Sequence, residues 1–331
     1  SDIHQGFATG LGIQLDEKFA EHWSILVNTC GSIATEGKAS PAHTALICGT
    51  GELLSTSLAC QILSGMNLNV HWLDARRILK LDETATTGKR KRYLSAICHF
   101  DADHKIQQHL LDLNNSEQNI VFVTQGFIAS NPDGETILLG RGGSDTSAAT
   151  IAAILQADEL EIWTDVPGIF TANPHQVPSA RLLTQLDYSE AQEIASAGAK
   201  VLHPRSIRPA REAGIPIQIC SVLQPDIKGT RIDAGTTDTA IVKAISMRTD
   251  LVVLTIETSG MWQESGFLGQ VFSIFGNNGI SIDLVSTSES NVTVSLDAKA
   301  NELDREVMQL CLDELSQIAR VNVREPVASI S

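Results

Sequence analysis

One glycine-rich turn holds the residues best suited to chemistry on an anion. An apolar run at residues 136–139 leads into Gly-Arg-Gly-Gly at 140–143, and an alanine-rich segment follows at 148–157. This order predicts a strand, a turn whose glycines let a ligand approach the backbone, and a helix. The free N–H groups and the dipole at the start of that helix favour an anion. Arg141 adds a planar guanidinium that binds a carboxylate or a phosphate through two hydrogen bonds.

Ser144 and Asp145 stand where either side chain can cap the expected helix. The same turn also fits a purely structural connection in which Arg141 lies in solvent, because glycine-rich loops are common. The combination of glycines, arginine and helix start favours the anion site over that alternative.

Glu52 and His203 are two further candidates for chemistry. Glycines at residues 49–51 are expected to open a helix that has Glu52 in its first turn. A carboxylate there complements the helix dipole, and the residues alone favour that role over ligand binding. His203 precedes Pro204 and is interpreted as a structural turn residue, because no acid–base partner is evident.

The elements that position these residues alternate between strands and helices. Strands are expected at residues 69–74, 119–124, 159–164 and 215–221. This alternation indicates an open parallel sheet, whose ligands bind in the crevice at the carboxyl ends of the strands. Thr164 and Asp165 come at one such end. A basic run at residues 89–92 is interpreted as a solvated loop.

Residues 240–320 differ in character from the rest of the chain. The pattern there predicts strand, helix, strand, strand and helix, and a last strand begins near residue 321. This order is typical of a ferredoxin-like α+β unit. The glycine- and threonine-rich residues 229–237 make a plausible boundary before it.

Length and composition exclude several classes of protein. The chain of 331 residues is long enough for about two domains, and its formal net charge of −15 argues against nucleic acid or an anionic membrane as the main partner. The six cysteines are scattered without a CxxC pair, so we expect reduced thiols, no zinc site and no disulfide framework. No apolar run approaches the roughly 18 residues of a membrane span and no signal peptide is visible, which predicts a soluble, cytoplasmic protein.

Five segments occur together in the order found in one enzyme family. They are residues 51–55 (GELLS), 124–128 (TQGFI), 139–145 (LGRGGSD), 163–169 (WTDVPGI) and 198–204 (GAKVLHP). Any one segment is a weak signal, but all of them in order at compatible spacing are very specific. Over nearly its whole length the sequence resembles aspartokinase, of the amino-acid kinase superfamily, and closely matches the lysine-sensitive type. Residues 240–320 resemble an ACT domain, the ligand-sensing module attached to such kinases.

The resemblance implies an α/β fold, a three-layer αβα sandwich with an open, mostly parallel sheet, plus a ferredoxin-like (ACT) α+β domain. It implies an N-terminally incomplete catalytic domain at residues 1–235 and an ACT regulatory region at 236–331. Within that region, a first ACT unit spans residues 245–320 and the start of a second, truncated unit follows. The implied activity is ATP- and Mg²⁺-dependent phosphorylation of the side-chain carboxylate of L-aspartate, the first step of lysine, threonine and methionine biosynthesis.

Roles on the aspartate side are also implied by the resemblance. Arg141 is expected to pair with a carboxylate of aspartate, Glu52 with its ammonium, and Phe127 to wall the pocket. Asp145 is expected to organise the catalytic lysine or the Mg²⁺ side of the reaction. Donors to the substrate and to the transferring phosphoryl group are expected from Gly142, Gly143 and Ser144.

The nucleotide side is implied to consist of Thr164, Asp165, Phe170, His175 and Lys200. Of these, Phe170 is expected near the adenine and Lys200 near the phosphates. His175 belongs to Asn173-Pro174-His175, which stands where the family has Asp-Pro-Arg. This departure weakens the expected phosphate contact.

The ACT region is implied to bind an inhibitory amino acid, lysine. The matching residues are Met261, Ser265, Gly266, Phe267, Leu268, Asp283, Thr287, Ser288 and Glu289. Asp283 and Glu289 suit an ammonium group, and backbone N–H groups near Gly266 suit a carboxylate. The alternative is that these residues are surface acids and a glycine at a helix start. ACT units commonly pair edge to edge, so we expect a homodimer through residues 240–320.

Two departures from the family pattern concern the ends of the sequence. The family's first strand, with its Lys-Phe-Gly-Gly motif, has no match here, and its absence is expected to leave unpaired strand edges. The second ACT repeat stops after Val327. A second hypothesis is therefore a kinase-like protein that senses an amino acid without catalysis. A third is a kinase of glutamate, acetylglutamate or carbamate.

Overall fold

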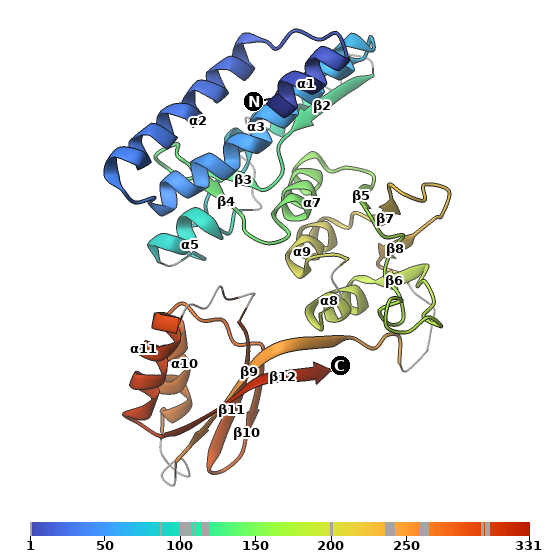
Figure 1. The fold of residues 1–331 in the computed structure, drawn as a ribbon. Helices are drawn as coiled ribbons and strands as arrows, with labels where there is room; N and C mark the ends of the chain where they lie inside the picture. Colours follow the sequence, from blue (N-terminus) through green and yellow to red (C-terminus); the bar gives the residue numbers. More distant parts are fainter. Residues whose placement is uncertain are drawn as a thin grey trace. The chain divides into compact units, whose positions relative to one another are not determined.

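The chain folds into two compact units (Figure 1). Unit 1 comprises residues 1–196 and 200–243, and unit 2 comprises residues 197–199 and 244–331. The computed structural model describes residues 2–86, 88–99, 107–108, 110–113, 119–198, 201–235, 242–258, 265–298, 301 and 305–331.

Unit 1 opens with three helices: α1 (Asp2–Gly10), α2 (Glu17–Glu36) and α3 (Pro41–Gly65). The Asp16 side chain caps α2 by accepting a hydrogen bond from the N–H of Phe19 at 2.8 Å. This helix ends at Gly37, whose φ of 72° lies in the left-handed region. At the start of α3, the Ser40 hydroxyl accepts a hydrogen bond from the N–H of His43 at 3.1 Å.

The expected helix start at residues 49–51 is wrong, because these residues lie inside α3. A Cβ at Gly49 would lie 2.8 Å from Cγ2 of Thr136, so this glycine lets α3 pack closely on its neighbours. By length and composition alone α3 could also cross a membrane, although core helices of globular proteins pass the same test. Leu53 and Leu54 are each 2% exposed, and we interpret α3 as a core helix of unit 1.

Two small pairs of strands pack near α3. The strands β1 (Asn69–Leu73) and β2 (Ile120–Thr124) are parallel, and β3 (Ile128–Ser130) and β4 (Thr136–Leu138) form an antiparallel hairpin. Short helices between β1 and β2 include α4 (Ala75–Ile78) and α5 (Lys89–Leu94), and residues 107–108 and 110–113 are also helical. The helix α5 replaces the solvated loop expected at residues 89–92.

A second, four-stranded sheet has the order β5-β7-β8-β6. The pairs β5–β7 and β6–β8 are parallel, and β7–β8 is antiparallel. Its strands are β5 (Leu160–Thr164), β6 (Gln185–Asp187), β7 (Ile217–Ser221) and β8 (Thr230–Asp233). Neither β6 nor β8 was predicted, and β8 was missed because the glycines and threonines around residue 230 were interpreted as a boundary.

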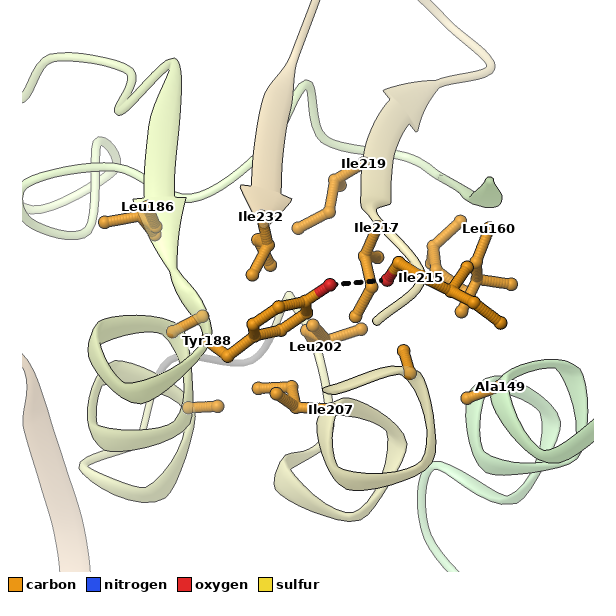
Figure 2. Packing of buried hydrophobic residues seen from close by; sticks show 14 of the residues in the cluster. Ala149, Leu160, Leu186, Tyr188, Leu202, Ile207, Ile215, Ile217, Ile219 and Ile232 are labelled. Carbon is orange, nitrogen blue, oxygen red and sulfur yellow. Dashed lines mark hydrogen bonds between the residues drawn. The ribbon is translucent and has the colours of Figure 1, made fainter. Parts of the chain in front are cut away.

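Helices pack against this sheet through a continuous apolar core (Figure 2). They are α7 (Gly143–Leu155), α8 (Tyr188–Ser196) and α9 (Pro204–Ala213). The core contains Ile207 from α9, and Ile217 and Ile232 from the sheet, all fully buried. Tyr188 joins it with its ring, and its hydroxyl donates a hydrogen bond to the carbonyl of Ile215 at 2.7 Å.

The parallel strands of unit 1 are divided between separate sheets. In the described ranges, β1–β2 and β5-β7-β8-β6 are not hydrogen-bonded to each other.

Unit 2 follows the predicted order strand, helix, strand, strand, helix, strand. Its elements are β9 (Met247–Glu257), α10 (Phe267–Asn277), β10 (Leu284–Thr287), β11 (Asn291–Asp297), α11 (Arg305–Ser316) and β12 (Arg320–Ile330). The sheet order is β10-β11-β9-β12, with every pair antiparallel. Both helices pack on the sheet around Leu254, Val271 and Cys311, each fully buried. Residues 324–330, expected to begin a second repeat, continue β12 along β9.

Candidate functional site

The glycine turn joins β4 to α7 in a conformation that glycine adopts easily. Gly140 and Gly142 have φ values of 71° and 63°. The N–H of Gly143 donates a hydrogen bond to the carbonyl of Gly140 at 3.0 Å. Gly142 is the N-cap of α7, and no side chain caps this helix. The predicted capping by Ser144 or Asp145 is therefore wrong.

The turn that follows β2 packs directly against the glycine turn. A Cβ at Gly126 would lie 2.9 Å from Cα of Ser144, and a Cβ at Gly143 would lie 2.8 Å from Cδ2 of Phe127. The backbone N–H of Phe127 donates to the hydroxyl of Ser147 at 3.0 Å. Phe127 has a φ of 68°, which is strained for a large side chain and must be held by its surroundings. The structure thus brings Phe127 next to the start of α7.

The loop before α9 also packs on the glycine turn. A Cβ at Gly142 would lie 2.2 Å from Cβ of His203, so this side chain lies against the glycine. Burial raises the pKa of Asp145. Its carboxylate accepts a hydrogen bond from the backbone N–H of His203, and this bond opposes the rise. Burial and the positive charges of Arg205 and Arg141 lower the pKa of His203. His203 is the N-cap of α9, where its Nδ1 accepts from the N–H of Arg205 at 3.2 Å, so the structural interpretation of this residue is confirmed.

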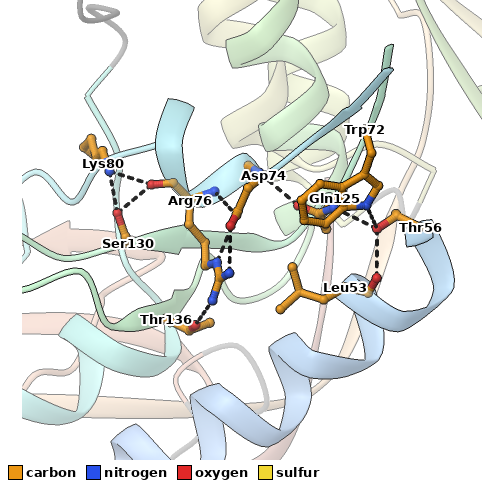
Figure 3. A network of polar contacts seen from close by, with 10 residues as sticks. Leu53, Thr56, Trp72, Asp74, Arg76, Lys80, Gln125, Ser130 and Thr136 are labelled. Atoms are coloured by element: carbon orange, nitrogen blue, oxygen red, sulfur yellow. Dashed lines mark hydrogen bonds and ion pairs between the residues drawn. The ribbon is translucent and has the colours of Figure 1, made fainter. Parts of the chain in front are cut away.

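A polar network ties α3 to the turn after β2 (Figure 3). Gln125 is 1% exposed. Its Nε2 donates to the hydroxyl of Thr56 at 2.7 Å, and its Oε1 accepts from the N–H of Ala75 at 2.9 Å. The indole N–H of Trp72 also donates to the Thr56 hydroxyl, at 3.1 Å. That hydroxyl in turn donates to the carbonyl of Glu52 at 2.8 Å, so the network holds Glu52 to the turn that packs on the glycine turn.

Glu52 lies in the middle of α3 and is partly buried. The expectation that it complements the dipole in the first turn of a helix is therefore wrong. Burial raises the pKa of its carboxyl group. Throughout the described part of the chain, this carboxyl group forms no hydrogen bond or ion pair. A partly buried acid in this state suits a cationic group of a ligand.

Thr164 and Asp165 lie at the carboxyl end of β5. In the sheet, Thr164 pairs with Ser221 at the end of β7. The Thr164 hydroxyl donates to Oδ1 of Asp165 at 3.1 Å. The loop that follows is fastened to β8, because the Thr230 hydroxyl accepts from the N–H of Ile169 at 2.9 Å. These contacts form a second group of polar residues in unit 1.

Phe170 and His175 lie in the segment after this loop. Phe170 is partly buried and forms an isolated bridge with Leu182. His175 is exposed, and its backbone N–H donates to Oδ1 of Asn173 at 3.0 Å. Lys200 lies outside the described residues. Among the residues that are described, no hydrogen bond or ion pair joins this group to the glycine turn.

Sequence reasoning missed three basic residues near these groups: Lys91, Arg205 and Lys228. The first lies in a basic run that was interpreted as a solvated loop. The last precedes Gly229, where a Cβ would lie 2.8 Å from the carbonyl oxygen of Pro167. The glycine- and threonine-rich stretch that begins here was interpreted as a boundary.

In unit 2, the residues matched to a regulatory site begin at the start of α10. Gly266, with a φ of 94°, is the N-cap of this helix, and Ser265 before it is exposed. Phe267 is 5% exposed and belongs to the core of unit 2, whereas Leu268 is 38% exposed. Met261 lies outside the described residues.

The matched acids of unit 2 lie at opposite ends of β10. Thr287 pairs with Val292 of β11 at one end. Exposed Ser288 and Glu289 form the turn between these strands. Asp283 precedes β10 at the other end, where its carboxylate lies 3.4 Å from the guanidinium of Arg248.

Comparisons with known proteins identify both parts of the chain. The amino acid kinase family profile matches residues 6–221, and an ACT domain profile matches residues 254–310. Lysine-sensitive aspartokinase 3 of Escherichia coli is 35% identical over 317 residues, which are 95% of this chain and 67% of that protein. Chloroplastic aspartokinase 1 of Arabidopsis thaliana is 37% identical over 214 residues, which are 63% of this chain and 38% of that protein.

Solved aspartokinase structures share the fold. The crystal structure of E. coli aspartokinase III in complex with aspartate and ADP (R-state) has a TM-score of 0.83 and 33% identity, covering 95% of this chain and 68% of that chain. The same enzyme in complex with lysine and aspartate (T-state) has a TM-score of 0.73 and 34% identity. These matches confirm the predicted fold class, an amino-acid kinase α/β fold with a ferredoxin-like domain. The chain therefore belongs to the amino acid kinase family, as an aspartokinase with a C-terminal ACT domain.

Proposed function

We propose that the protein transfers the γ-phosphoryl group of ATP to the side-chain carboxylate of L-aspartate, which yields aspartyl phosphate. The observation that supports this most is the joining of four family segments at one turn. Gln125 and Thr56 connect α3 to the turn after β2, Phe127 packs on Gly143, and His203 packs on Gly142. This activity would be the first step of lysine, threonine and methionine biosynthesis, in the cytoplasm.

On the aspartate side, Arg141 binds a carboxylate and Glu52 binds the ammonium. The exposed guanidinium of Arg141 has no acidic partner within the described ranges, and Glu52 is a partly buried acid with a raised pKa. The two groups therefore offer opposite charges to a zwitterionic ligand. Phe127 walls the pocket over Gly143.

On the phosphoryl side, the proposed donors are the backbone N–H of Gly142 and the hydroxyl of Ser144, while Gly143, whose N–H donates to the carbonyl of Gly140, lines the turn. Asp145, fixed by the His203 backbone, faces the Mg²⁺ side or the catalytic lysine. The proposed nucleotide residues are Thr164, Asp165, Phe170, His175 and Lys200. Bound Mg²⁺ would neutralise phosphate charge. A kinase site commonly holds this ion with one or two carboxylates and substrate phosphates, a donor set that Asp145 and Asp165 can supply.

The protein's contribution to this reaction is position and electrostatics. The attacking carboxylate and the triphosphate are both anions, and two unit charges 4 Å apart repel by about 4 kcal/mol at an effective dielectric constant of 20. Fixed cations and helix N–H groups offset that repulsion as negative charge spreads in the transition state. A glycine turn at the start of α7, with Arg141 in it, supplies both.

We further propose that unit 2 is the regulatory region, with the boundary expected after residue 235. Its effector is an amino acid, with lysine as the first candidate. The donors at the start of α10 suit the effector carboxylate, and Glu289 or Asp283 suits an ammonium. The protein forms a homodimer through its ACT units.

The direct test is aspartyl phosphate production, trapped as the hydroxamate. The Arg141→Ala variant should lose at least about 100-fold in kcat/KM, because it removes a bidentate charge-assisted pair. Arg211→Ala in the last turn of α9 removes the same charge from an exposed position and should retain activity. Unchanged turnover in Arg141→Ala would rule out this aspartate site.

A second candidate function is amino-acid sensing without catalysis. The division of the unit 1 strands between separate sheets favours it, because phosphoryl transfer needs groups held rigidly in place. Calorimetric titration with L-lysine, L-threonine and Mg-ATP separates the two candidates. Amino-acid binding without nucleotide binding would support sensing, and tight Mg-ATP binding would count against it.

A further inference from the structure

Three cations from separate segments surround the glycine turn. Lys91 belongs to α5, Arg141 to the turn itself, and Arg205 to the first turn of α9. All three side chains are exposed and open to a ligand from solvent. The chain as a whole has a formal net charge of −15, so a local group of positive charge needs a specific reason.

Packing of backbone against glycine brings the three segments together. A Cβ at Gly140 would lie 2.7 Å from the hydroxyl of Ser95, the C-cap of α5. The N–H of Ser95 donates to the carbonyl of Lys91 at 3.0 Å, so Lys91 lies one helical turn from this contact. Next to it, the N–H of Ala96 donates to the carbonyl of Leu138 at 2.8 Å. The end of α5 is thereby fixed against the strand that leads into the turn.

The start of α9 is held against the same turn by the side chain of His203. The 2.2 Å approach of the His203 Cβ to the Cβ position of Gly142 leaves no room for another residue type there. Arg205 follows in the first turn of α9, and its N–H donates to Nδ1 of His203. Every contact in this arrangement joins parts of unit 1.

No acid of the described chain neutralises these cations. Several other basic residues of unit 1 have carboxylate partners, such as Arg76 with Asp74 at 2.7 Å and Lys243 with Glu190 at 3.0 Å. In contrast, neither an ion pair nor a hydrogen bond to an acid is formed by the side chains of Lys91, Arg141 and Arg205 across the described ranges.

The cations also act on one another. Neighbouring protein atoms partly desolvate the exposed Lys91 side chain, and this effect, followed by the charge of Arg205, lowers the pKa of Lys91. Arg205 and Arg141 both lower the pKa of His203. Like charges that are close enough to repel raise the free energy of the folded protein. An anion bound among them would remove that cost.

We propose that Lys91 and Arg205, beside the Arg141 that holds the aspartate carboxylate, form a binding site for a doubly charged oxyanion, the phosphoryl group of the acyl phosphate or of its donor. The aspartate carboxylate neutralises one of the three positive charges, and a phosphoryl dianion neutralises the two that remain and offers three acceptor oxygens. The assignment of the dianion to this reaction rests on the proposed function. Lys91 and Arg205 are then positioning residues that hold the phosphoryl group over the turn.

Binding of inorganic orthophosphate, measured by isothermal titration of the whole protein, tests the site without turnover. Wild type should bind orthophosphate, and acetate at the same concentration should bind at least about tenfold more weakly. Lys91→Gln and Arg205→Gln should each weaken orthophosphate binding by about tenfold or more, because each removes a charge-assisted contact. Arg211→Gln is the matched control, with the same change of charge on α9, and should bind as wild type does.

Equal orthophosphate affinity in all of these proteins would overturn the proposal, as would acetate binding as tight as that of orthophosphate. Circular dichroism confirms that the exposed substitutions leave the fold intact. In the hydroxamate assay, the two variants should raise KM more than they lower kcat. Orthophosphate binding by a protein that makes no hydroxamate would refute the proposed function and leave the anion site standing.

Discussion

At the scale of residues, the candidate site contains groups whose state costs folding free energy. Glu52 is a partly buried carboxyl group with a raised pKa, and Phe127 has a left-handed φ of 68°. Departures of this kind are typical of functional positions, where stability is sacrificed for geometry. The sequence identified both residues through family segments. It could not give the burial of Glu52, because burial depends on how α3 packs in three dimensions.

We predict that Glu52→Gln weakens L-aspartate binding and stabilises the protein at neutral pH. The variant loses the partner of the substrate ammonium, so affinity should fall by about tenfold or more. The raised pKa means that the folded state binds this proton more tightly than the unfolded state does. Its contribution to stability is therefore present at low pH and lost as pH rises through the folded pKa. Glutamine does not ionise, so the variant does not lose this stability as pH rises.

Calorimetric titration with L-aspartate and urea unfolding, each from pH 4 to pH 8, measure both effects. In wild type, aspartate affinity should fall as pH drops through the raised pKa of Glu52, and the variant should lack this dependence. Glu190→Gln is a control, because that carboxylate is paired with Lys243 at 3.0 Å and its loss should not stabilise the protein. A Glu52→Gln protein that is less stable than wild type at neutral pH would contradict the view that the buried Glu52 carboxylate destabilises the fold.

At the scale of elements, most strands and helices followed from hydrophobic pattern and glycine position. The exceptions have identifiable causes. The start of α3 was misplaced because Gly49 serves packing against Thr136 rather than helix initiation, and the sequence cannot separate these two uses of glycine. The strand β8 was missed because Thr230 follows Gly229 in a stretch typical of a linker. The Thr230 hydroxyl accepts a hydrogen bond from the N–H of Ile169. This contact joins residues far apart in the chain, so the local sequence does not show it.

The contact between the glycine turn and α9 predicts a large cost for Gly142→Ala. Gly142 and Gly214 have similar left-handed φ values of 63° and 68°, so alanine at either position costs about 1 kcal/mol of backbone strain. A Cβ at Gly142 also meets His203 at 2.2 Å, whereas a Cβ at Gly214 has no atom within 4 Å. Gly142→Ala should therefore lose roughly 1–3 kcal/mol more than Gly214→Ala in urea unfolding.

The pair Gly142→Ala and Gly214→Ala separates backbone strain from steric contact. Hydroxamate activity should fall in Gly142→Ala and persist in Gly214→Ala, because only the first displaces the loop that packs on the glycine turn. Equal losses of unfolding free energy would show that His203 does not lie against Gly142.

At the scale of the whole molecule, two units have separate hydrophobic cores. Unit 1 contains the clusters around Ile217 and Ile128, and unit 2 contains the cluster around Leu254. The sequence predicted two parts and both fold classes, because motif order and the change of pattern near residue 240 are properties of the chain itself. The convergence of Lys91 and Arg205 on one turn lay beyond sequence reasoning, since it arises only when distant segments pack.

Because the two units have separate cores, we expect each unit to unfold in its own transition. We also expect each transition to respond to a different ligand. In differential scanning calorimetry of the whole protein, L-lysine should raise one transition and Mg-ATP the other, because each ligand stabilises only the unit that binds it. At 100 times its Kd, a ligand adds about 2.7 kcal/mol, which shifts the transition of the small unit 2 by roughly 10–20 °C and that of the larger unit 1 by roughly 5–10 °C. D-Lysine is the control and should shift neither transition. If the ACT units form the homodimer, the transition that L-lysine raises should also rise with protein concentration. A shift of the Mg-ATP transition by L-lysine alone would contradict an effector site in unit 2.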